Sequence, residues 1–134
     1  MVESTTERVL HCVVVTPERA LLDEPADFVA LPMYDGELGV LPGRAPLIGR
    51  LGCGELRIKR GGDTRRFFVD GGFAQVRTNT VTVLTGRAMK AEEINMSAAE
   101  AALNAPAAPG TTAEARRMNQ ARARAQLRVA RGGH

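Results

Sequence analysis

Short apolar or alternating runs, separated by turn residues, occupy the N-terminal part of the chain, residues 9–85. Val9–Val15 is rich in β-branched residues and Phe28–Leu31 is a second apolar run, and a proline follows each of them closely. Glu55–Lys59 alternates polar and apolar residues, which is the pattern of a strand with one solvated face. Because turn signals recur about every 8 to 12 residues, an antiparallel β-sandwich or flattened barrel of short strands is favoured over a βαβ fold.

Glycine-rich turns divide the second half of this β region. Gly61-Gly62-Asp63 predicts a tight hairpin, since glycine adopts the positive φ angles that such turns require. Arg66–Val69 is expected to be the returning strand. Asp70-Gly71-Gly72 predicts another turn, after which Phe73–Arg77 and Thr80–Leu84 are expected to be the next two strands.

The pattern becomes helical towards the C-terminus. Residues 91–105 are rich in Ala and Glu, and Ser97-x-x-Glu100 is a capping-box pattern for a first helix. Residues 104–110 contain two prolines and a glycine, which predict a connector. Thr111-x-x-Glu114 is a second capping box, and the helix that it opens is expected to continue to Arg131.

The length of 134 residues is typical of one compact unit with a short appendage. Hydrophobic and charged residues make up 44 % and 25 % of the chain, as in ordinary globular proteins. We therefore expect a β-sandwich domain over residues 1–88 and a C-terminal α-helical hairpin, a helix–loop–helix domain, over residues 89–134.

The net charge of +3 is concentrated at the C-terminal end. Residues 111–134 carry six arginines against one glutamate, whereas basic and acidic side chains nearly balance over residues 1–90. A partner of the tail should therefore be acidic. A solvated helix face can carry the same charge without a partner, so both interpretations stay open.

Two cysteines, Cys12 and Cys53, are too few for a zinc site, and each is expected to be a buried, reduced thiol. The N-terminus lacks a basic region followed by an apolar run, so no secretory signal is predicted. No apolar stretch approaches the ~18 residues that a membrane span needs. These features predict a cytoplasmic protein that reaches a membrane through partners.

A catalytic site needs convergent reactive groups, and the sequence offers few. The two histidines are His11 and His134. His11 and Cys12 are neighbours in a predicted strand and should point to opposite faces, which argues against a Cys–His pair. The motifs GxxxxGK[ST], GxSxG and HExxH are absent. We therefore expect no catalytic residue, no cofactor and no metal site.

Two further classes of protein remain as alternatives. A nucleic-acid-binding module could use the Arg-rich C-terminal helix, since arginines release counterions from phosphates. The β region, however, lacks a basic patch, and the aromatic content of 4 % leaves few stacking platforms. A small β-sandwich enzyme is the second alternative, and the missing catalytic set disfavours it.

Residues 36–47 read Gly-Glu-Leu-Gly-Val-Leu-Pro-Gly-Arg-Ala-Pro-Leu. This stretch resembles the signature of the epsilon subunits of F-type ATP synthases, which reads GELG, two further residues, and PGHAPL or a close variant. Further agreements follow in the family's order at Gly52-x-Gly54-x-Leu56-Arg57-Ile58, Val69–Phe73 and Val81–Leu84. The resemblance covers essentially the whole chain and is weakest over residues 95–115.

The resemblance implies a non-catalytic rotor subunit of the central stalk, which couples ion flow through the c-ring to ATP synthesis. It implies the gamma subunit and the c-ring as partners, no nucleic acid, and a peripheral position at the cytoplasmic face of the bacterial plasma membrane. The implied contact loop comprises Glu37, Leu38, Gly39, Val40, Leu41, Pro42, Gly43 and Arg44. Its glycines and prolines predict a rigid surface loop in which Glu37 and Arg44 flank exposed apolar Val40 and Leu41.

The resemblance also implies that the C-terminal hairpin either folds against the sandwich or extends along gamma. In the extended form it would inhibit ATP hydrolysis by meeting an acidic segment of the catalytic beta subunits, beside the alpha subunits. Placed at about 100° per residue, the second helix carries four arginines within about 60° of one another. This basic stripe comprises Arg117, Arg124, Arg128 and Arg131, and an adjoining apolar face is predicted from Met118, Ala121, Ala125 and Val129.

The chain departs from the nucleotide-binding members of that family, whose first helix begins Ile/Leu-Asp-x-x-Arg-Ala. The corresponding stretch is Ile94–Ala99, where Asn95 and Ala98 replace the two charged residues. We therefore expect weak or absent ATP binding by the isolated chain. The first helix also has few large apolar residues, which predicts a loosely docked hairpin.

Overall fold

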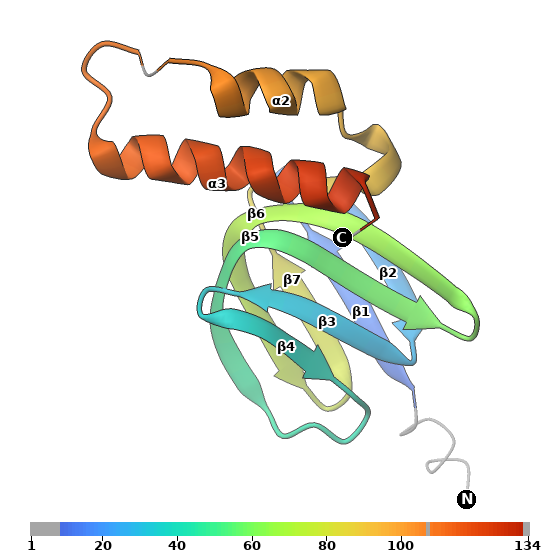
Figure 1. The fold of residues 1–134 in the computed structure, drawn as a ribbon. Helices are drawn as coiled ribbons and strands as arrows, with labels where there is room; N and C mark the ends of the chain where they lie inside the picture. Colours follow the sequence, from blue (N-terminus) through green and yellow to red (C-terminus); the bar gives the residue numbers. More distant parts are fainter. Residues whose placement is uncertain (1–8, 107, 133–134) are drawn as a thin grey trace, which may run out of the picture.

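The computed structural model describes residues 9–106 and 108–132 and consists of a β-sandwich followed by two helices (Figure 1). The strands are β1 (Leu10–Val15), β2 (Ala20–Ala26), β3 (Phe28–Met33), β4 (Gly36–Val40), β5 (Leu47–Arg60), β6 (Asp63–Arg77), β7 (Thr80–Leu84) and β8 (Ala88–Lys90). A 3-10 turn, η1 (Ala91–Glu93), leads into α2 (Met96–Asn104) and α3 (Ala113–Ala130). The sandwich and its helix pair confirm the fold class expected from the sequence.

The strands pair in the order β2-β1-β7-β6-β5-β3-β4, and β8 pairs with β6. These pairings are antiparallel except that of β1 with β7, which is parallel and sets His11 opposite Thr80 and Val15 opposite Leu84. This parallel pair departs from the antiparallel arrangement that we expected. Parallel neighbours need a long crossover, and here the intervening strands of the sandwich provide it.

The strands β5 and β6 are much longer than the runs that predict them. The expected strand Glu55–Lys59 is part of the 14-residue β5, and Arg66–Val69 and Phe73–Arg77 belong to the single 15-residue β6. The turn predicted at Asp70-Gly71-Gly72 is wrong, because pairing with β5 continues through these residues. Positive φ angles at Gly71 and Gly72, 72° and 111°, bend the strand without ending it.

The bend changes which residues of β6 face the core. Phe67 and Val69 lie in the core before the glycines, whereas Ala74 and Val76 lie in it after them. Unbroken alternation would have kept the odd-numbered residues inside. As a result Phe73, which follows the glycines directly, is 52 % exposed on the outer side of the sandwich.

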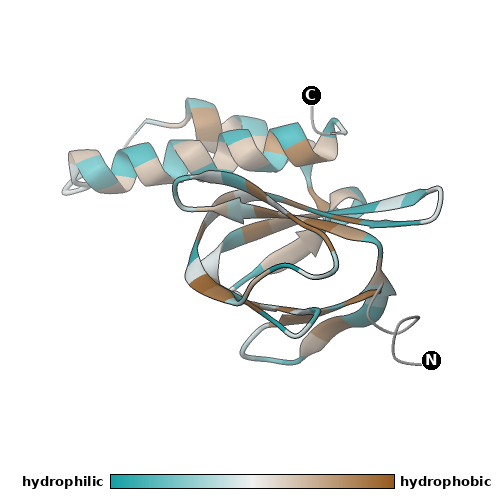
Figure 2. Ribbon diagram, turned by 90° about the horizontal axis from the view of Figure 1, so that it is seen from below, coloured by the Kyte–Doolittle hydropathy of each residue, from teal (hydrophilic) through white to brown (hydrophobic). Residues whose placement is uncertain are grey.

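The core of the sandwich is built mainly from aliphatic side chains. Hydrophobic residues, coloured brown in Figure 2, recur along the strands that enclose it. The fully buried residues include Leu10, Val14, Leu31, Leu56 and Val81. Cys12 is also fully buried there, while its neighbour His11 is exposed and pairs with Asp23 on β2. The two residues therefore face opposite sides of β1, as strand alternation predicts.

The helices α2 and α3 form a hairpin beside the outer side of β5 and β6 (Figure 1). A second, smaller cluster joins Phe68 of β6 and Ile94 to Ala125 and Val129 of α3. In α2, Ala99 is buried, so this helix adds little apolar area to the hairpin.

Both helices begin one or two residues away from the predicted capping boxes. The N-cap of α2 is Asn95, whose side chain accepts a hydrogen bond from the Ala98 N–H at 3.0 Å. The N-cap of α3 is Thr112, which accepts from the Ala115 N–H at 3.1 Å. The positions predicted for the caps, Ser97 and Thr111, are therefore wrong, although residues of the preferred capping types fill both sites. Gly133 and His134 lie outside the described residues.

Substitution of Gly72 by alanine is expected to destabilise the sandwich by about 3 kcal/mol, because its φ is unfavourable for other residues and a Cβ would overlap the carbonyl oxygen of Leu84. Urea unfolding followed by circular dichroism measures the change. Gly62→Ala is the matched control, since a Cβ there meets nothing within 4 Å. Equal stability of the two variants would contradict the role assigned to Gly72.

Candidate functional site

The segment expected to form a contact loop is part strand and part loop. Gly36–Val40 is the strand β4, which pairs with β3, and the loop itself covers residues 41–46. This loop lies at the end of the sandwich away from the helices (Figure 1). Gly43, at φ 87°, donates its N–H to the Asn79 side-chain oxygen at 2.8 Å. The β4–β5 loop is thus tied to the turn between β6 and β7.

The apolar residues of this segment divide between the core and the surface. Val40 is fully buried, opposite Val29 in the sheet, so the prediction that it is exposed is wrong. Leu38 packs partly against the same core. Leu41 alone of these three is strongly exposed, at 60 %. Core packing therefore explains most of the apolar run, and Leu41 is its one strongly exposed residue.

The two charged residues of the predicted contact loop differ in their surroundings. Glu37 accepts two hydrogen bonds from the Arg57 guanidinium, at 2.9 and 3.2 Å. Burial alone would lower the pKa of Arg57, but the hydrogen bonds that its guanidinium donates to Glu37 and Glu55 outweigh burial and raise this pKa. Arg44 is exposed in the loop itself. Arg44 and Leu41 are therefore available for contact, whereas Glu37 helps to fix the edge strand β4.

An exposed apolar face on the outside of β5, β6 and β7 was not foreseen. It consists of Ile48, Phe73 and Leu84, which are 74 %, 52 % and 49 % exposed. Phe73 lies directly opposite Leu84 in the register of β6 and β7. Arg50, opposite Phe73 on β5, stacks over the ring of Tyr34 at 4.6 Å. These side chains give a rigid sheet surface with apolar and aromatic groups, which is a frequent composition of protein interfaces.

The sequence does contain a signal for this apolar face. Leu47-Ile48 and Val83-Leu84 are pairs of apolar neighbours within strands. Neighbours in a strand point to opposite faces, so one member of each pair must point away from the core. Leu47 and Val83 belong to the core region, which leaves Ile48 and Leu84 outside.

The predicted basic stripe lies on the solvent side of α3. Arg117, Arg124, Arg128 and Arg131 are all exposed. The buried side of α3 consists of Ala123, Ala125, Leu127 and Val129, on the opposite side of the helix. The stripe therefore stays accessible while the hairpin is packed on the sandwich.

The prediction of an apolar face on α3 is only partly confirmed. Ala125 and Val129 are buried, but Met118 is 56 % exposed and Ala121 is exposed as well. The helix is rotated so that its small residues meet the sheet, which a helical projection alone does not reveal. Arg131 of the stripe approaches Glu100 of α2 at 3.8 Å, and both side chains are about half exposed. Such a pair contributes little stability.

Sequence reasoning also missed Arg122, the arginine on the inner side of α3. Its Nε donates to the Asp70 carboxylate of β6 at 2.8 Å. The two residues are 52 positions apart, and no local pattern in the sequence connects them.

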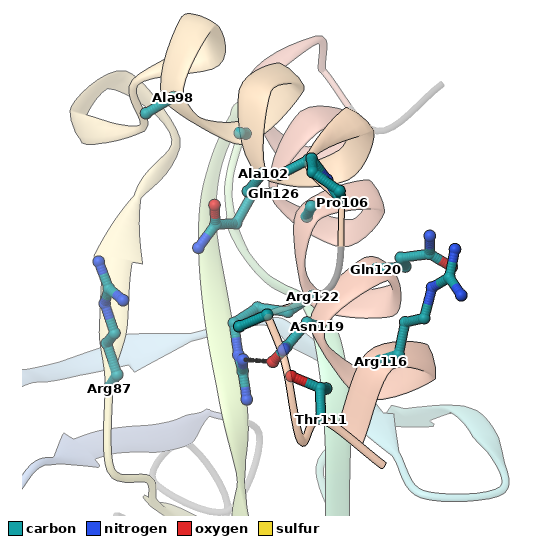
Figure 3. A pocket seen from close by; sticks show the side chains of 14 residues that line it. Arg87, Ala98, Ala102, Pro106, Thr111, Arg116, Asn119, Gln120, Arg122 and Gln126 are labelled. Atoms are coloured by element: carbon teal, nitrogen blue, oxygen red, sulfur yellow. Dashed lines mark hydrogen bonds between the residues drawn. The ribbon is translucent and has the colours of Figure 1, made fainter. Parts of the chain in front are cut away.

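A cleft of about 430 Å³ lies beside the hairpin (Figure 3). Three arginines line it, Arg87 before β8 and Arg116 and Arg122 on α3, together with alanines of α2 such as Ala98. Asn95, at the start of α2, uses its side-chain oxygen to cap the helix. The two positions at which nucleotide-binding relatives are expected to carry charges therefore hold a capping amide and a methyl group.

The described part of the chain contains no group of three or more His, Cys, Asp or Glu side chains that could hold a metal ion. Burial raises the pKa of both Cys12 and Cys53 to about 12, so neither thiol is a ready nucleophile near neutral pH. Among the helices within residues 9–106 and 108–132, none has the length and apolar character to cross a membrane.

Residues 9–91 match the family model described as ATP synthase, Delta/Epsilon chain, beta-sandwich domain. The ATP synthase epsilon chain of Rhodopirellula baltica is 53 % identical over 126 residues, which cover 91 % of this chain and 98 % of that one. The epsilon chain of a Synechococcus species is 38 % identical over 126 residues, covering 90 % and 92 % of the two chains.

Solved structures of two mitochondrial ATP synthases contain chains with the same fold. The structure from Euglena gracilis, of OSCP/F1/c-ring, contains a chain with a TM-score of 0.64 and 24 % identity, covering 90 % of this chain and 76 % of that one. The central stalk and c-ring from Tetrahymena thermophila contain a chain with a TM-score of 0.65 and 13 % identity, covering 90 % and 96 %. At such low identity these likenesses support the fold alone.

The β-sandwich domain and the near full-length similarity to curated relatives together define the class of protein. The chain belongs to the ATP synthase epsilon chain family. The resemblance seen in the sequence is thereby confirmed, as is the expectation of a subunit of ATP synthase in place of a free-standing enzyme.

Isothermal titration of the isolated chain with ATP is expected to show no micromolar binding, because Asn95 and Ala98 at the start of α2 replace the carboxylate and the cation that nucleotide-binding relatives are expected to carry there. The double variant Asn95→Asp/Ala98→Arg restores both groups and is expected to strengthen binding by about tenfold or more. A micromolar dissociation constant for the unaltered chain would contradict this prediction.

Proposed function

We propose that the chain is a non-catalytic subunit of the central-stalk rotor of an F-type ATP synthase, where it couples ion flow through the c-ring to ATP synthesis. The observation that carries the proposal is the 53 % identity to an ATP synthase epsilon chain over 98 % of that relative. The surfaces described above support it, since a rotor subunit must bind partners on several sides at once. No reaction is assigned to the chain itself.

The β4–β5 loop is the proposed contact with the c-ring. It lies at the end of the sandwich opposite the helices, and it is anchored by the bond from Gly43 to Asn79. A preorganised loop loses little conformational entropy on docking. Leu41 and Arg44 are its exposed contact residues, and Glu37 holds the adjoining strand through Arg57.

The apolar face of Ile48, Phe73 and Leu84 is the proposed contact with the gamma subunit. Large apolar side chains that lie together on a sheet surface are typical of interaction sites. The hairpin packs elsewhere, on the outer side of the other half of β5 and β6, so this face is free for a partner. Since gamma forms the axis of the shaft, contact with it would make the chain turn with the rotor.

We place the chain at the cytoplasmic face of the bacterial plasma membrane, as a peripheral subunit. Its contact with the membrane would pass through the complex, in line with the helices of the described region being too short or too polar to span a bilayer. The two curated relatives described above, from Rhodopirellula baltica and a Synechococcus species, come from bacteria, which supports this location.

The basic stripe on α3 is the proposed brake on ATP hydrolysis. Arg117, Arg124, Arg128 and Arg131 lie on the exposed side of the helix, where they can pair with carboxylates of the beta and alpha subunits; Arg131 would exchange its exposed contact with Glu100 for such a pair. The same stripe would also attract nucleic-acid phosphates, and this is the alternative function of the tail.

Substitution Phe73→Asp is expected to weaken binding to the gamma subunit by about 30-fold, because it places a charge in the centre of the apolar face. The affinity is measured by biolayer interferometry with purified gamma. Met118→Asp is the matched control, since Met118 is equally exposed but lies on α3. Unchanged affinity of the Phe73 variant, with an intact circular-dichroism spectrum, would refute the assignment of this face.

Deletion of residues 111–134 is expected to raise ATP hydrolysis by the assembled enzyme by about fivefold, because the acidic partner of the tail loses its cations. Replacing the four stripe arginines by glutamine should give most of the same effect while keeping α3. Equal hydrolysis by the intact and truncated complexes would show that the tail is no brake. Salt-sensitive retention of the chain on DNA, without affinity for gamma, would instead favour the nucleic-acid alternative.

A further inference from the structure

Among the described residues, one ion pair links α3 to the sandwich. Arg122 Nε donates to Asp70 Oδ2 at 2.8 Å, and the two side chains are 34 % and 23 % exposed. Arg122 Nη1 also donates to the Asn119 side-chain oxygen at 3.1 Å (Figure 3). The guanidinium is therefore held from its own helix and from β6 together, so little side-chain entropy remains to be lost in the pair.

The apolar contact beneath α3 is small. It is formed by Ala125 and Val129 of the helix against Phe68 and Ile94, and the partly buried residues packed around them are Cys53, Met89, Ala91 and Ala130. Alanine and valine bury modest apolar area, so this contact contributes only modestly to the docking free energy of the hairpin. A single partly buried charge pair is then a substantial part of that free energy.

We propose that the Asp70–Arg122 pair is the lock that holds α3 on the sandwich and sets how often the hairpin is released. Arg122 lies on the inner side of the helix, whereas the stripe arginines lie on the outer side. Docking and binding of an acidic partner are thus assigned to different arginines, Arg122 to the first and the four stripe arginines to the second. The role of the Asp70–Arg122 pair in docking follows from this geometry. The effect of the pair on ATP hydrolysis rests on the proposed function.

The two cysteines of the chain distinguish release of α3 from unfolding of the sandwich. Cys53 is half-buried, less than the sequence led us to expect, and packs against the cluster that contains Ala125 and Val129, so release of α3 exposes it further. Cys12 is fully buried in the core of the sandwich, so it becomes accessible when the sandwich unfolds. Comparing the reaction of the two thiols with a maleimide distinguishes local release from global opening.

The test is the variant Arg122→Gln of the full chain, labelled with excess maleimide at constant pH and analysed by peptide mass spectrometry. The lock predicts about fivefold faster labelling of Cys53 and an unchanged rate at Cys12. The Arg122 cation lowers the pKa of Cys53, so its removal by itself would slow the reaction. Faster labelling therefore reports exposure of the thiol.

Matched variants assign the effect to the charge pair. Arg128→Gln removes a charge from the exposed side of the same helix and should leave both rates unchanged, while Arg122→Lys should restore part of the protection. In an Asp70→Asn background, Arg122→Gln should cause no further acceleration, because the partner is already absent. Unchanged labelling of Cys53 in Arg122→Gln, or equal acceleration of Cys12, would overturn the lock.

A second readout separates the lock from the proposed brake. In the assembled ATP synthase, Arg122→Gln should lower ATP hydrolysis, because the released hairpin reaches its inhibitory position more often. Faster Cys53 labelling with unchanged hydrolysis would keep the lock and refute the brake. Unchanged labelling together with lowered hydrolysis would refute the lock.

Discussion

The structure depends on the close approach of Gly72 to the carbonyl group of Leu84, where the long β5–β6 ribbon bends. A side chain at this position would overlap the backbone of β7, and the φ of 111° is open to glycine alone among common residues. The bend lets two continuous strands pass around the sandwich, and it exchanges the inner and outer residues of β6. Without it, Phe73 would be a core residue and the apolar outer face would not form.

This bend gives one ribbon two different outer surfaces. The half of β6 before the glycines presents Phe68 and Asp70, which receive α3. The half after them presents Phe73, which forms an apolar face with Ile48 and Leu84. The proposed release of the hairpin and the proposed contact with gamma would therefore use the same two strands without competing. For a subunit of a rotating shaft, this separation of the two surfaces would allow the C-terminal hairpin to be released while the sandwich stays attached to the rotor.

The fold class and both helices followed from the period-two runs and the capping residues of the sequence. The turn predicted at Asp70-Gly71-Gly72 failed because glycines with positive φ occur both in turns and in bent strands, and only the pairing partner distinguishes them. The exposure predicted for Val40 failed because pairing with β3 turns it inward. The contact of Arg122 with Asp70 could not be predicted, since it depends on how α3 is placed on the sheet. The exposure of Ile48 and Leu84, in contrast, could have been predicted, because each has an apolar neighbour in its strand that points into the core.

The most direct test of this account is a cryo-electron microscopy map of the ATP synthase that contains this chain. The account predicts the sandwich on the central stalk, with the β4–β5 loop against the c-ring and the face around Phe73 against gamma. A map in which the chain is absent from the stalk, or meets gamma and the c-ring through other surfaces, would contradict it.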